Sequence, residues 1–323
     1  MNVLSCFDGM SCAQIALERL GIKVDNYFVS EIDEYAIKVT QDNYPNTIQL
    51  GDITKIDTSK LPKIDLLIGG SPCQSFSLNG KKLNFNDPRG KLFFDFERIL
   101  KEVKPKYFLM ENVKMKKEWE DVISEHLGVS PIELNSSLVS AQNRKRMYWT
   151  NIPNVTQPKD KRILLRDILE DYDEQDLYQC GDFVEMKKDD GFVINNNFKF
   201  LNYKHEKSLI QESIKNYPDN FKSSQRVATM SPGYQWQRVY SINAKATTLL
   251  TDNGMKIVDK DLKVRRLSVL ECERLQNVPD DYTKAVSRTR RTHMLGNGYT
   301  VGIIVHILQG LKQNSKSNNL FDY

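Results

Sequence analysis

The chain has 323 residues and the composition of a soluble globular protein, with 40% hydrophobic, 27% charged and 10% aromatic residues and a net charge of +4. No apolar run approaches the roughly 20 residues that cross a bilayer, and no secretory signal is recognisable at the N-terminus. The five cysteines lack zinc-type or paired spacing, which argues against a disulfide framework and indicates a reducing compartment. We therefore expect a cytoplasmic protein with one large and one smaller domain.

The N-terminal half alternates short apolar runs with helical patterns, which predicts a mostly parallel sheet with helices on both faces. Residues 3–5 should form the first strand, and 13–20 a helix that ends at Gly21. Further strands are expected at 27–30, 47–50, 64–68 and 107–110, with a helix over 92–103. The fold class is therefore α/β and Rossmann-like.

Five candidate site residues lie just past the carboxyl ends of these strands: Gly9, Glu31, Asp52, Cys73 and Glu111. Ligands of open α/β sheets bind at that edge. A glycine turn followed some 20 residues later by an acid suits the ribose of a nucleoside. The sequence has no Gly-x-x-x-x-Gly-Lys phosphate cradle, which favours a cofactor without pyrophosphate, such as S-adenosylmethionine.

Cys73 lies in Gly70-Ser71-Pro72-Cys73-Gln74, which leads into a polar, basic segment at 75–90. A lone cysteine is usually a buried structural residue, but a loop at a strand end can present a thiolate as a nucleophile. The basic segment has the composition of a flap over a polyanion. Glu111 could bind N3 and the amine of a cytosine and supply a proton while the thiolate adds to C6. Carbon 5 would then accept a methyl group, and loss of its proton would expel the cysteine.

In order and spacing these motifs resemble those of the DNA (cytosine-5) methyltransferases of bacteria and phages, from residue 3 to about residue 310. The matching motifs are Phe7-Asp8-Gly9, Pro72-Cys73-Gln74, Glu111-Asn112-Val113, Gln142-Asn143-Arg144-Lys145-Arg146, the block 266–275 and Gly296-Asn297-Gly298. Ser11 and Ser71 depart from the usual residues of the family, but neither removes a reactive group.

The resemblance implies a Cys73 nucleophile, with Glu111, Arg144 and Arg146 as further catalytic residues, and Arg146 supporting the base and the acid. It also implies S-adenosylmethionine as cofactor and no metal. The cofactor-binding residues that it implies are Phe7, Asp8, Gly9, Met10, Glu31, Ile32, Asp52, Ile53, Pro72, Leu92, Asn297 and Tyr299.

The region 153–264 is rich in Asn, Lys and Asp and has weak periodicity, which predicts a smaller, irregular target-recognition domain. We expect a catalytic domain at 1–155, the target-recognition domain at 156–288 and a returning C-terminal segment at 289–323. The resemblance implies that the smaller domain contacts duplex DNA in the major groove, and Gln235 and Asn79 are candidates to fill the gap left by a flipped base. The expected DNA contacts are Ser77, Asn79, Lys81, Arg89, Gln235, Arg238, Thr248 and Leu249.

Three alternative functions fit the sequence less well. Related enzymes that methylate transfer RNA carry a Cys-Phe-Thr signature, which this sequence lacks. A catalytically inactive relative would be expected to have lost Cys73, Glu111 or the cofactor motif, and all are present. An enzyme for a small molecule would leave the region 153–264 and the basic flap unexplained. We therefore expect a monomeric bacterial or phage DNA enzyme at the nucleoid, whose cognate restriction endonuclease, if it has one, would be a separate chain.

Overall fold

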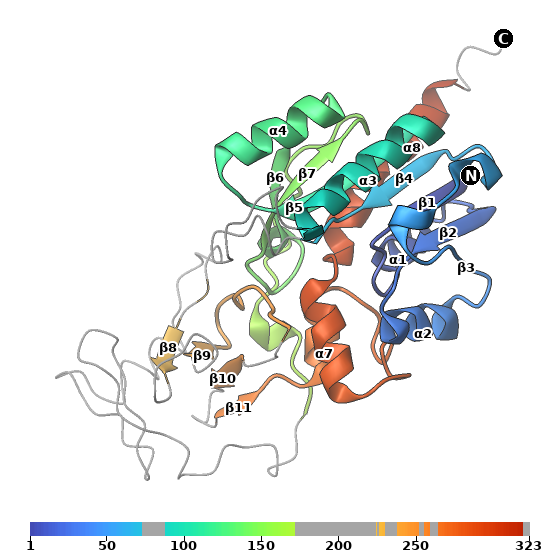
Figure 1. Cartoon of the computed structure of the whole chain (residues 1–323). Helices are drawn as coiled ribbons and strands as arrows, with labels where there is room; N and C mark the ends of the chain where they lie inside the picture. The colour runs from blue at the N-terminus through green and yellow to red at the C-terminus, as the bar shows by residue number, and fades with distance from the viewer. Residues whose placement is uncertain are drawn as a thin grey trace.

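A computed structural model describes residues 1–72, 88–171, 224, 226–229, 238–251, 255–258 and 264–318 (Figure 1). These residues form a seven-stranded sheet of order β3-β2-β1-β4-β5-β7-β6 and a separate four-stranded sheet. None of the helices in the described ranges is long and apolar enough to cross a bilayer.

The large sheet is parallel over its first five strands. β1 (Asn2–Cys6) pairs with β2 (Asn26–Ser30) and with β4 (Leu66–Gly69), and the short β3 (Ile48–Gln49) and β5 (Tyr107–Val113) flank these strands. Parallel strands end at the same edge, so the loops that follow them converge there. The predicted strands and the α/β fold class are confirmed.

Two further strands, which the sequence pattern did not reveal, extend the sheet beyond β5. β7 (Lys145–Thr150) runs antiparallel to β5, and β6 (Ile132–Asn135) runs antiparallel to β7. β7 begins with the charged pair Lys145-Arg146, which hides its period of two, and β6 alternates over only four residues, too few to be distinctive. This antiparallel edge brings Arg146 of the Gln-x-Arg-x-Arg motif into the sheet beside β5.

Helices cover both faces, because successive strand residues point in opposite directions. On β4, Leu66 and Ile68 belong to one core cluster and Leu67 to the other, and all are fully buried. The first cluster takes in α1 (Cys12–Arg19) and α8 (Val301–Asn318), which pack against each other. The second takes in α3 (Pro88–Val103) and α4 (Lys117–Leu127). The other α-helices in the described part of the chain are α2 (Glu34–Asn43), α6 (Val269–Leu275) and α7 (Arg288–Asn297).

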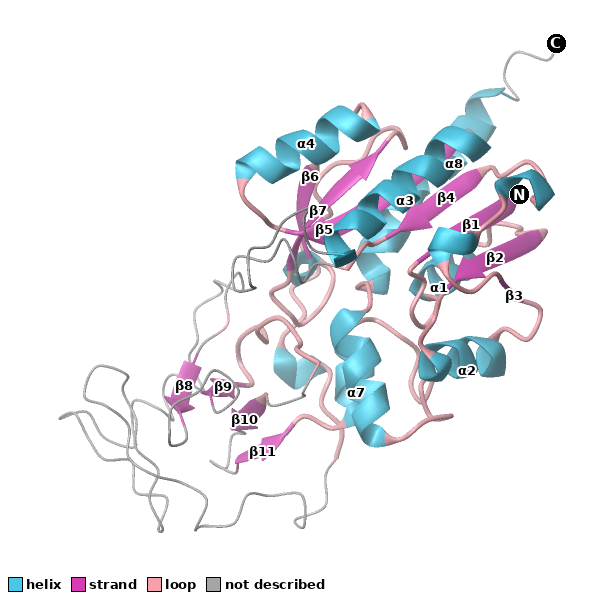
Figure 2. Ribbon diagram, viewed as in Figure 1, coloured by secondary structure: helices cyan, strands magenta, loops and turns pink. Residues whose placement is uncertain are grey.

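The small sheet has the order β11-β10-β9-β8 and lies apart from the large one (Figure 2). Its strands are β8 (Arg226–Thr229), β9 (Arg238–Ser241), β10 (Lys256–Val258) and β11 (Val264–Arg266). The segment after β9 joins it to the rest of the protein: the Ala246 amide donates to Ala141 O at 2.7 Å, and Ala246 O accepts from the Asn143 amide at 2.8 Å. Nearby, fully buried Lys245 donates to the carbonyls of Ser140 (3.0 Å) and Ile163, and burial lowers its pKa to about 8.

A buried ion pair fastens the small sheet to α6. The guanidinium of Arg265 donates to both carboxylate oxygens of Glu271 at 2.7 and 2.6 Å, and the two side chains are 4% and 0% exposed. We expect Glu271→Ala to lower the free energy of unfolding by about 3–5 kcal/mol, because it leaves a buried cation without its partner. Asp121→Ala, which breaks the exposed Lys117–Asp121 pair, should cost less than about 1 kcal/mol. Urea unfolding of the two variants measures both, and equal losses would contradict the prediction.

Candidate active site

The chain turns sharply after β1, and this turn forms the first wall of the site. Phe7, Gly9 and Ser11 have φ angles of 55°, 60° and 58°, in the left-handed region that glycine adopts freely and other residues rarely. Asp8 points inward and is 5% exposed; it accepts hydrogen bonds from Tyr27 Oη at 3.1 Å and from Ser11 Oγ. Burial raises the pKa of Asp8 to about 6, although these hydroxyls act in the opposite direction. Its carboxyl therefore shapes the turn from within.

Glu31, at the end of β2, is bound to this turn. Its Oε2 accepts from the Gly9 amide at 2.8 Å, and its Oε1 accepts from the amides of Ile32 and Asp33 at 2.7 and 2.9 Å. The side chain of Ile32 is 77% exposed, which is unusual for a large apolar residue beside a sheet edge. An apolar surface next to a fixed carboxylate suits the ring and ribose of an adenosine.

Two further strand ends contribute to the same edge. Asp52 caps the short helix Ile53–Lys55 and accepts from the Thr54 amide and hydroxyl at 3.0 and 2.8 Å, while Ile53 is 4% exposed. Pro72, beyond β4, and Leu92, on α3, are both half-buried.

The end of α7 returns to the first turn. A β-carbon at Gly298 would lie 2.9 Å from Met10 Cε, so the two segments touch. Tyr282 Oη donates to Met10 O at 2.8 Å and holds the turn from the same side. Asn297 is exposed and Tyr299 is 8% exposed. The structure thus brings Met10 and Gly298 together from opposite ends of the chain.

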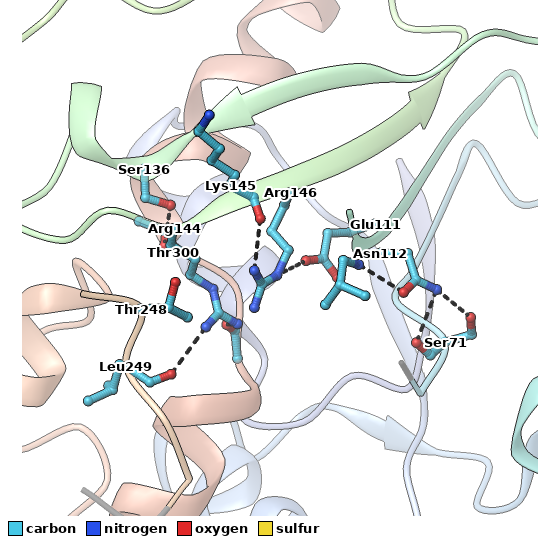
Figure 3. A network of polar contacts seen from close by, with 12 residues as sticks. Ser71, Glu111, Asn112, Ser136, Arg144, Lys145, Arg146, Thr248, Leu249 and Thr300 are labelled. Atoms are coloured by element: carbon cyan, nitrogen blue, oxygen red, sulfur yellow. Dashed lines mark hydrogen bonds and ion pairs between the residues drawn. The ribbon is translucent and has the colours of Figure 1, made fainter. Parts of the chain in front are cut away.

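Glu111 and Arg146 form the polar centre of the site (Figure 3). Arg146 Nε lies 3.0 Å from Glu111 Oε1, and the side chains are 15% and 14% exposed. Burial raises the pKa of Glu111, while Arg146 and then Arg144 oppose that rise. A carboxyl of this kind can hold a proton and release it to a base, as a general acid requires.

Asn112 links this centre to the loop that leads to Cys73. Its Nδ2 donates to Ser71 Oγ at 3.1 Å, and its Oδ1 accepts from the Val113 amide at 2.8 Å (Figure 3). Asn112 is 1% exposed, so this contact is protected from water. The carboxyl end of β5 and the residues just before Cys73 are therefore held together.

Arg144 lies beside this centre but binds main chain. It is 3% exposed and donates to Leu249 O at 3.4 Å and Gly298 O at 3.1 Å. Thr248 Oγ1 donates to Asn143 O at 2.9 Å, and the Leu249 side chain is 1% exposed. Arg144 thus joins the segment after β9 to the end of α7.

Several expected residues lie outside the described part of the chain. They are Cys73, Ser77, Asn79, Lys81 and Gln235. For Arg89 and Arg238 the structure describes only their place in α3 and β9. The proposed nucleophile and the expected DNA contacts all remain predictions.

Gln276 was not anticipated. It is fully buried: its Nε2 donates to Leu295 O at 2.6 Å and Gly298 O at 3.3 Å, and its Oε1 accepts from Gln142 Nε2 and Thr300 Oγ1, both at 2.8 Å. Its position directly after the block 266–275 was the available signal. Tyr282 was also missed, since an isolated tyrosine carries no motif.

Comparisons with known proteins show the family to which the chain belongs. The family model described as C-5 cytosine-specific DNA methylase matches residues 1–313. The chain is 31% identical over 307 residues to the type II methyltransferase M1.ScrFI of Lactococcus lactis subsp. cremoris, covering 90% of this chain and 74% of the relative. It is 28% identical over 334 residues to the type II methyltransferase M.HhaI of Haemophilus parahaemolyticus, covering 95% and 93%.

Solved structures share the fold. The Entamoeba histolytica methyltransferase EhMeth superposes with a TM-score of 0.68 at 14% identity, covering 98% of each chain. The Dnmt2 methyltransferase of S. pombe superposes with a TM-score of 0.59 at 15% identity, covering 97% of this chain and 99% of the other. At such identities the likeness concerns the fold alone.

The buried Asp8 predicts a pH dependence of stability. The pKa of Asp8 in the folded protein, about 6, exceeds the ordinary value of 3.8, so folding favours its protonated form. The destabilisation from the ionised form is absent below about pH 4, grows as the pH rises to about 6 and is constant above that, amounting to roughly 1–3 kcal/mol. We expect the difference in unfolding free energy between the wild type and Asp8→Asn to change by this amount between pH 4 and 7. Urea titrations at several pH values measure it, and a constant difference would contradict the prediction.

Proposed function

The chain belongs to the C-5 cytosine-specific DNA methylase family and is a DNA (cytosine-5) methyltransferase; we propose that it acts on a flipped-out cytosine within a specific duplex sequence, through a covalent adduct of Cys73. The observation that carries this proposal is the Glu111–Arg146 pair, 3.0 Å between Oε1 and Nε, on the strand end that Asn112 ties to Ser71. Cys73 follows Ser71 by two residues in the sequence, which supports pairing this acid with that nucleophile.

The first turn and the strand ends beside it suit S-adenosylmethionine. The exposed side chain of Ile32 can pack on the adenine ring, and the carboxylates of Glu31 and Asp52 can accept hydrogen bonds from the ribose and the adenine amine. When bound, the cofactor supplies an electrophilic methyl group on a sulfonium. The residues proposed to hold it are Phe7, Asp8, Gly9, Met10, Glu31, Ile32, Asp52, Ile53, Pro72, Leu92, Asn297 and Tyr299.

Each catalytic side chain has a separate role in the reaction. The Cys73 thiolate adds to C6 of the cytosine, and the proton of Glu111 passes to N3, so that C5 becomes nucleophilic. Arg146 stabilises the carboxylate that Glu111 becomes, and it holds the acid in position. After C5 has accepted the methyl group, a water molecule acting as base takes the C5 proton and the C6–S bond breaks, which releases the Cys73 thiolate. The N3 proton returns to the Glu111 carboxylate, and the aromatic ring is restored.

Extruding the base from a duplex costs on the order of a few kcal/mol, which DNA contacts must offset. We place these contacts on the flap (Ser77, Asn79, Lys81, Arg89) and on the target-recognition domain at 156–288 (Gln235, Arg238, Thr248, Leu249). Since Leu249 is buried, its part is to hold the segment whose neighbour Leu250 is 41% exposed. Residues 1–155 and the returning segment 289–323 then carry the catalytic edge.

We place the protein in the cytoplasm of a bacterium or of a phage-infected cell, where it acts as a monomer on double-stranded DNA. Its relatives include type II methyltransferases and an orphan methyltransferase of Bacillus phage SPR, to which the chain is 38% identical over 165 residues, covering 47% of this chain and 38% of the relative. A cognate restriction endonuclease would be a separate chain.

Bisulfite sequencing of a plasmid from cells that express the protein tests the activity and reads the target sequence. We expect protected cytosines at one short motif. Cys73→Ser should abolish transfer of label from S-adenosylmethionine to duplex DNA, and Glu111→Gln should reduce it by about 10²–10³-fold, because the general acid is lost. Binding of the cofactor to both variants is the control. Label transfer that survives Cys73→Ser, or that reaches transfer RNA and not DNA, would refute the proposal.

The adenine surface is tested by a pair of isoleucines. Ile32→Ser should raise the dissociation constant of S-adenosylmethionine about tenfold, because roughly 1.4 kcal/mol of apolar contact is lost. Ile48→Ser, on β3 and 40% exposed, is the matched control and should leave the constant unchanged. Isothermal titration measures both, and equal effects would place the adenine elsewhere.

A further inference from the structure

Tyr299 carries a buried hydroxyl that the mechanism above does not use. The residue follows Gly298 and precedes α8, and it is 8% exposed. Within the described ranges its Oη has no hydrogen-bond partner. A buried hydroxyl without a partner is unfavourable, and it is therefore expected to serve a group that arrives during the reaction cycle or a neighbour that moves.

The hydroxyl points to the strand end that precedes Cys73. A β-carbon at Gly70 would lie 2.7 Å from Tyr299 Oη and 3.2 Å from Glu111 Oε2. Both oxygens therefore lie close to the position that a β-carbon of residue 70 would occupy, and only glycine leaves that position empty. The phenol and the catalytic carboxyl are neighbours across the missing side chain of Gly70.

The two oxygens of Glu111 have different surroundings. Oε1 lies 3.0 Å from Arg146 Nε. Oε2 is the oxygen that lies next to Gly70, where Tyr299 Oη is also found. Among the residues that the structure describes, the charged and titratable groups around Glu111 are Arg146 on β7, Arg144 just before β7, Tyr148 across the strand ladder and Tyr299. Burial, and then Glu111, raise the pKa of Tyr299 far above its usual range, so the phenol keeps its proton and is able to donate it in a hydrogen bond.

We propose that the Tyr299 hydroxyl is a second hydrogen-bond donor to Glu111, at Oε2, opposite Arg146 at Oε1. This inference rests on the proposed function. Glu111 loses its proton to N3 of the cytosine, and Tyr299 donates a hydrogen bond to the carboxylate that forms while keeping its own proton. A neighbouring hydroxyl that is free to donate to the oxygen where charge develops stabilises the transition state. Tyr299 is therefore a positioning residue that acts through Glu111.

The competing assignment gives the same hydroxyl to the cofactor, because the resemblance places Tyr299 in a cofactor motif. The two assignments differ in kinetics. A donor to Glu111 changes the rate of the chemical step and its pH dependence, whereas a donor to the cofactor changes the binding of S-adenosylmethionine. The ring of Tyr299 can line the cofactor pocket in either case.

Tyr299→Phe removes the hydroxyl and keeps the ring. We expect kcat for methylation of duplex DNA to fall about tenfold, with the dissociation constant of S-adenosylmethionine unchanged within about twofold. A donor to the carboxylate lowers the pKa of Glu111, so its removal raises that pKa. The limb on which kcat falls with rising pH should therefore move upward by about one pH unit, the equivalent of a tenfold change.

Tyr282→Phe is the matched control, since that hydroxyl donates to Met10 O in the first turn. It should weaken cofactor binding and leave the pH limb in place. If Tyr299→Phe behaves like Tyr282→Phe, or leaves both kcat and the pH limb unchanged in an active enzyme, the inference is overturned. A wild type that methylates no DNA would instead overturn the proposed function.

The contact at Gly70 has a readout that does not need activity. Gly70→Ala should lower the melting temperature, because its β-carbon would meet Tyr299 Oη at 2.7 Å. Adding Tyr299→Phe should restore part of the loss, since the next atom of that ring, Cε1, lies at 3.1 Å. Additive losses in the double variant would show that the hydroxyl does not border Gly70, and the inference would fail.

Discussion

The ion pair between Glu111 and Arg146 depends on the antiparallel pairing of β5 with β7. That ladder sets Arg146 across from Val113, close enough for its guanidinium to reach Glu111 Oε1 at 3.0 Å. The pair is shielded from water, so burial can raise the pKa of the acid while the cation keeps it ionisable. A carboxyl balanced in this way can both give and regain a proton. Three further groups lie around this carboxyl. Asn112 holds Ser71, Arg144 holds the segment after β9, and the hydroxyl of Tyr299 lies beside Gly70.

Buried polar side chains join segments that are distant in the chain. Arg144, Gln142 and Gln276 bind main-chain carbonyls from the segment after β9, the end of α6 and the end of α7. An unsatisfied buried carbonyl or amide is costly, so these segments cannot shift independently without breaking several hydrogen bonds at once. These hydrogen bonds couple the small sheet to the end of α7, which lies against the turn after β1. Gly298 in turn lies against Met10 of the first turn.

Much of the fold was predictable from local pattern. The apolar runs at 27–30 and 64–68 correspond to β2 and β4, and the alternation with helical segments indicated the α/β class that the structure and the family comparison confirm. β7 was missed because Lys145 and Arg146 interrupt the period of a strand, and β6 because its alternation covers only four residues. The residues of the site were named from motifs, but the inward direction of Asp8 and the main-chain role of Arg144 were not. Both depend on partners, Tyr27 and Leu249, that no spacing rule connects to them.

Local periodicity and short motifs were enough to indicate the class of fold, the family, and the positions of Gly9, Glu31 and Asp52 just past strands. Glu111, expected just past a strand as well, instead lies inside β5, opposite Tyr148. Tertiary structure alone decided which of these groups touch. Tyr282 reaches Met10, Gln276 reaches Gly298, and Tyr299 borders Gly70 and Glu111. Such contacts arise when helices and strands pack, and their geometry depends on the whole core and not on any local pattern. For the same reason, the surroundings that raise the pKa of Glu111 could not be foreseen before the chain was folded.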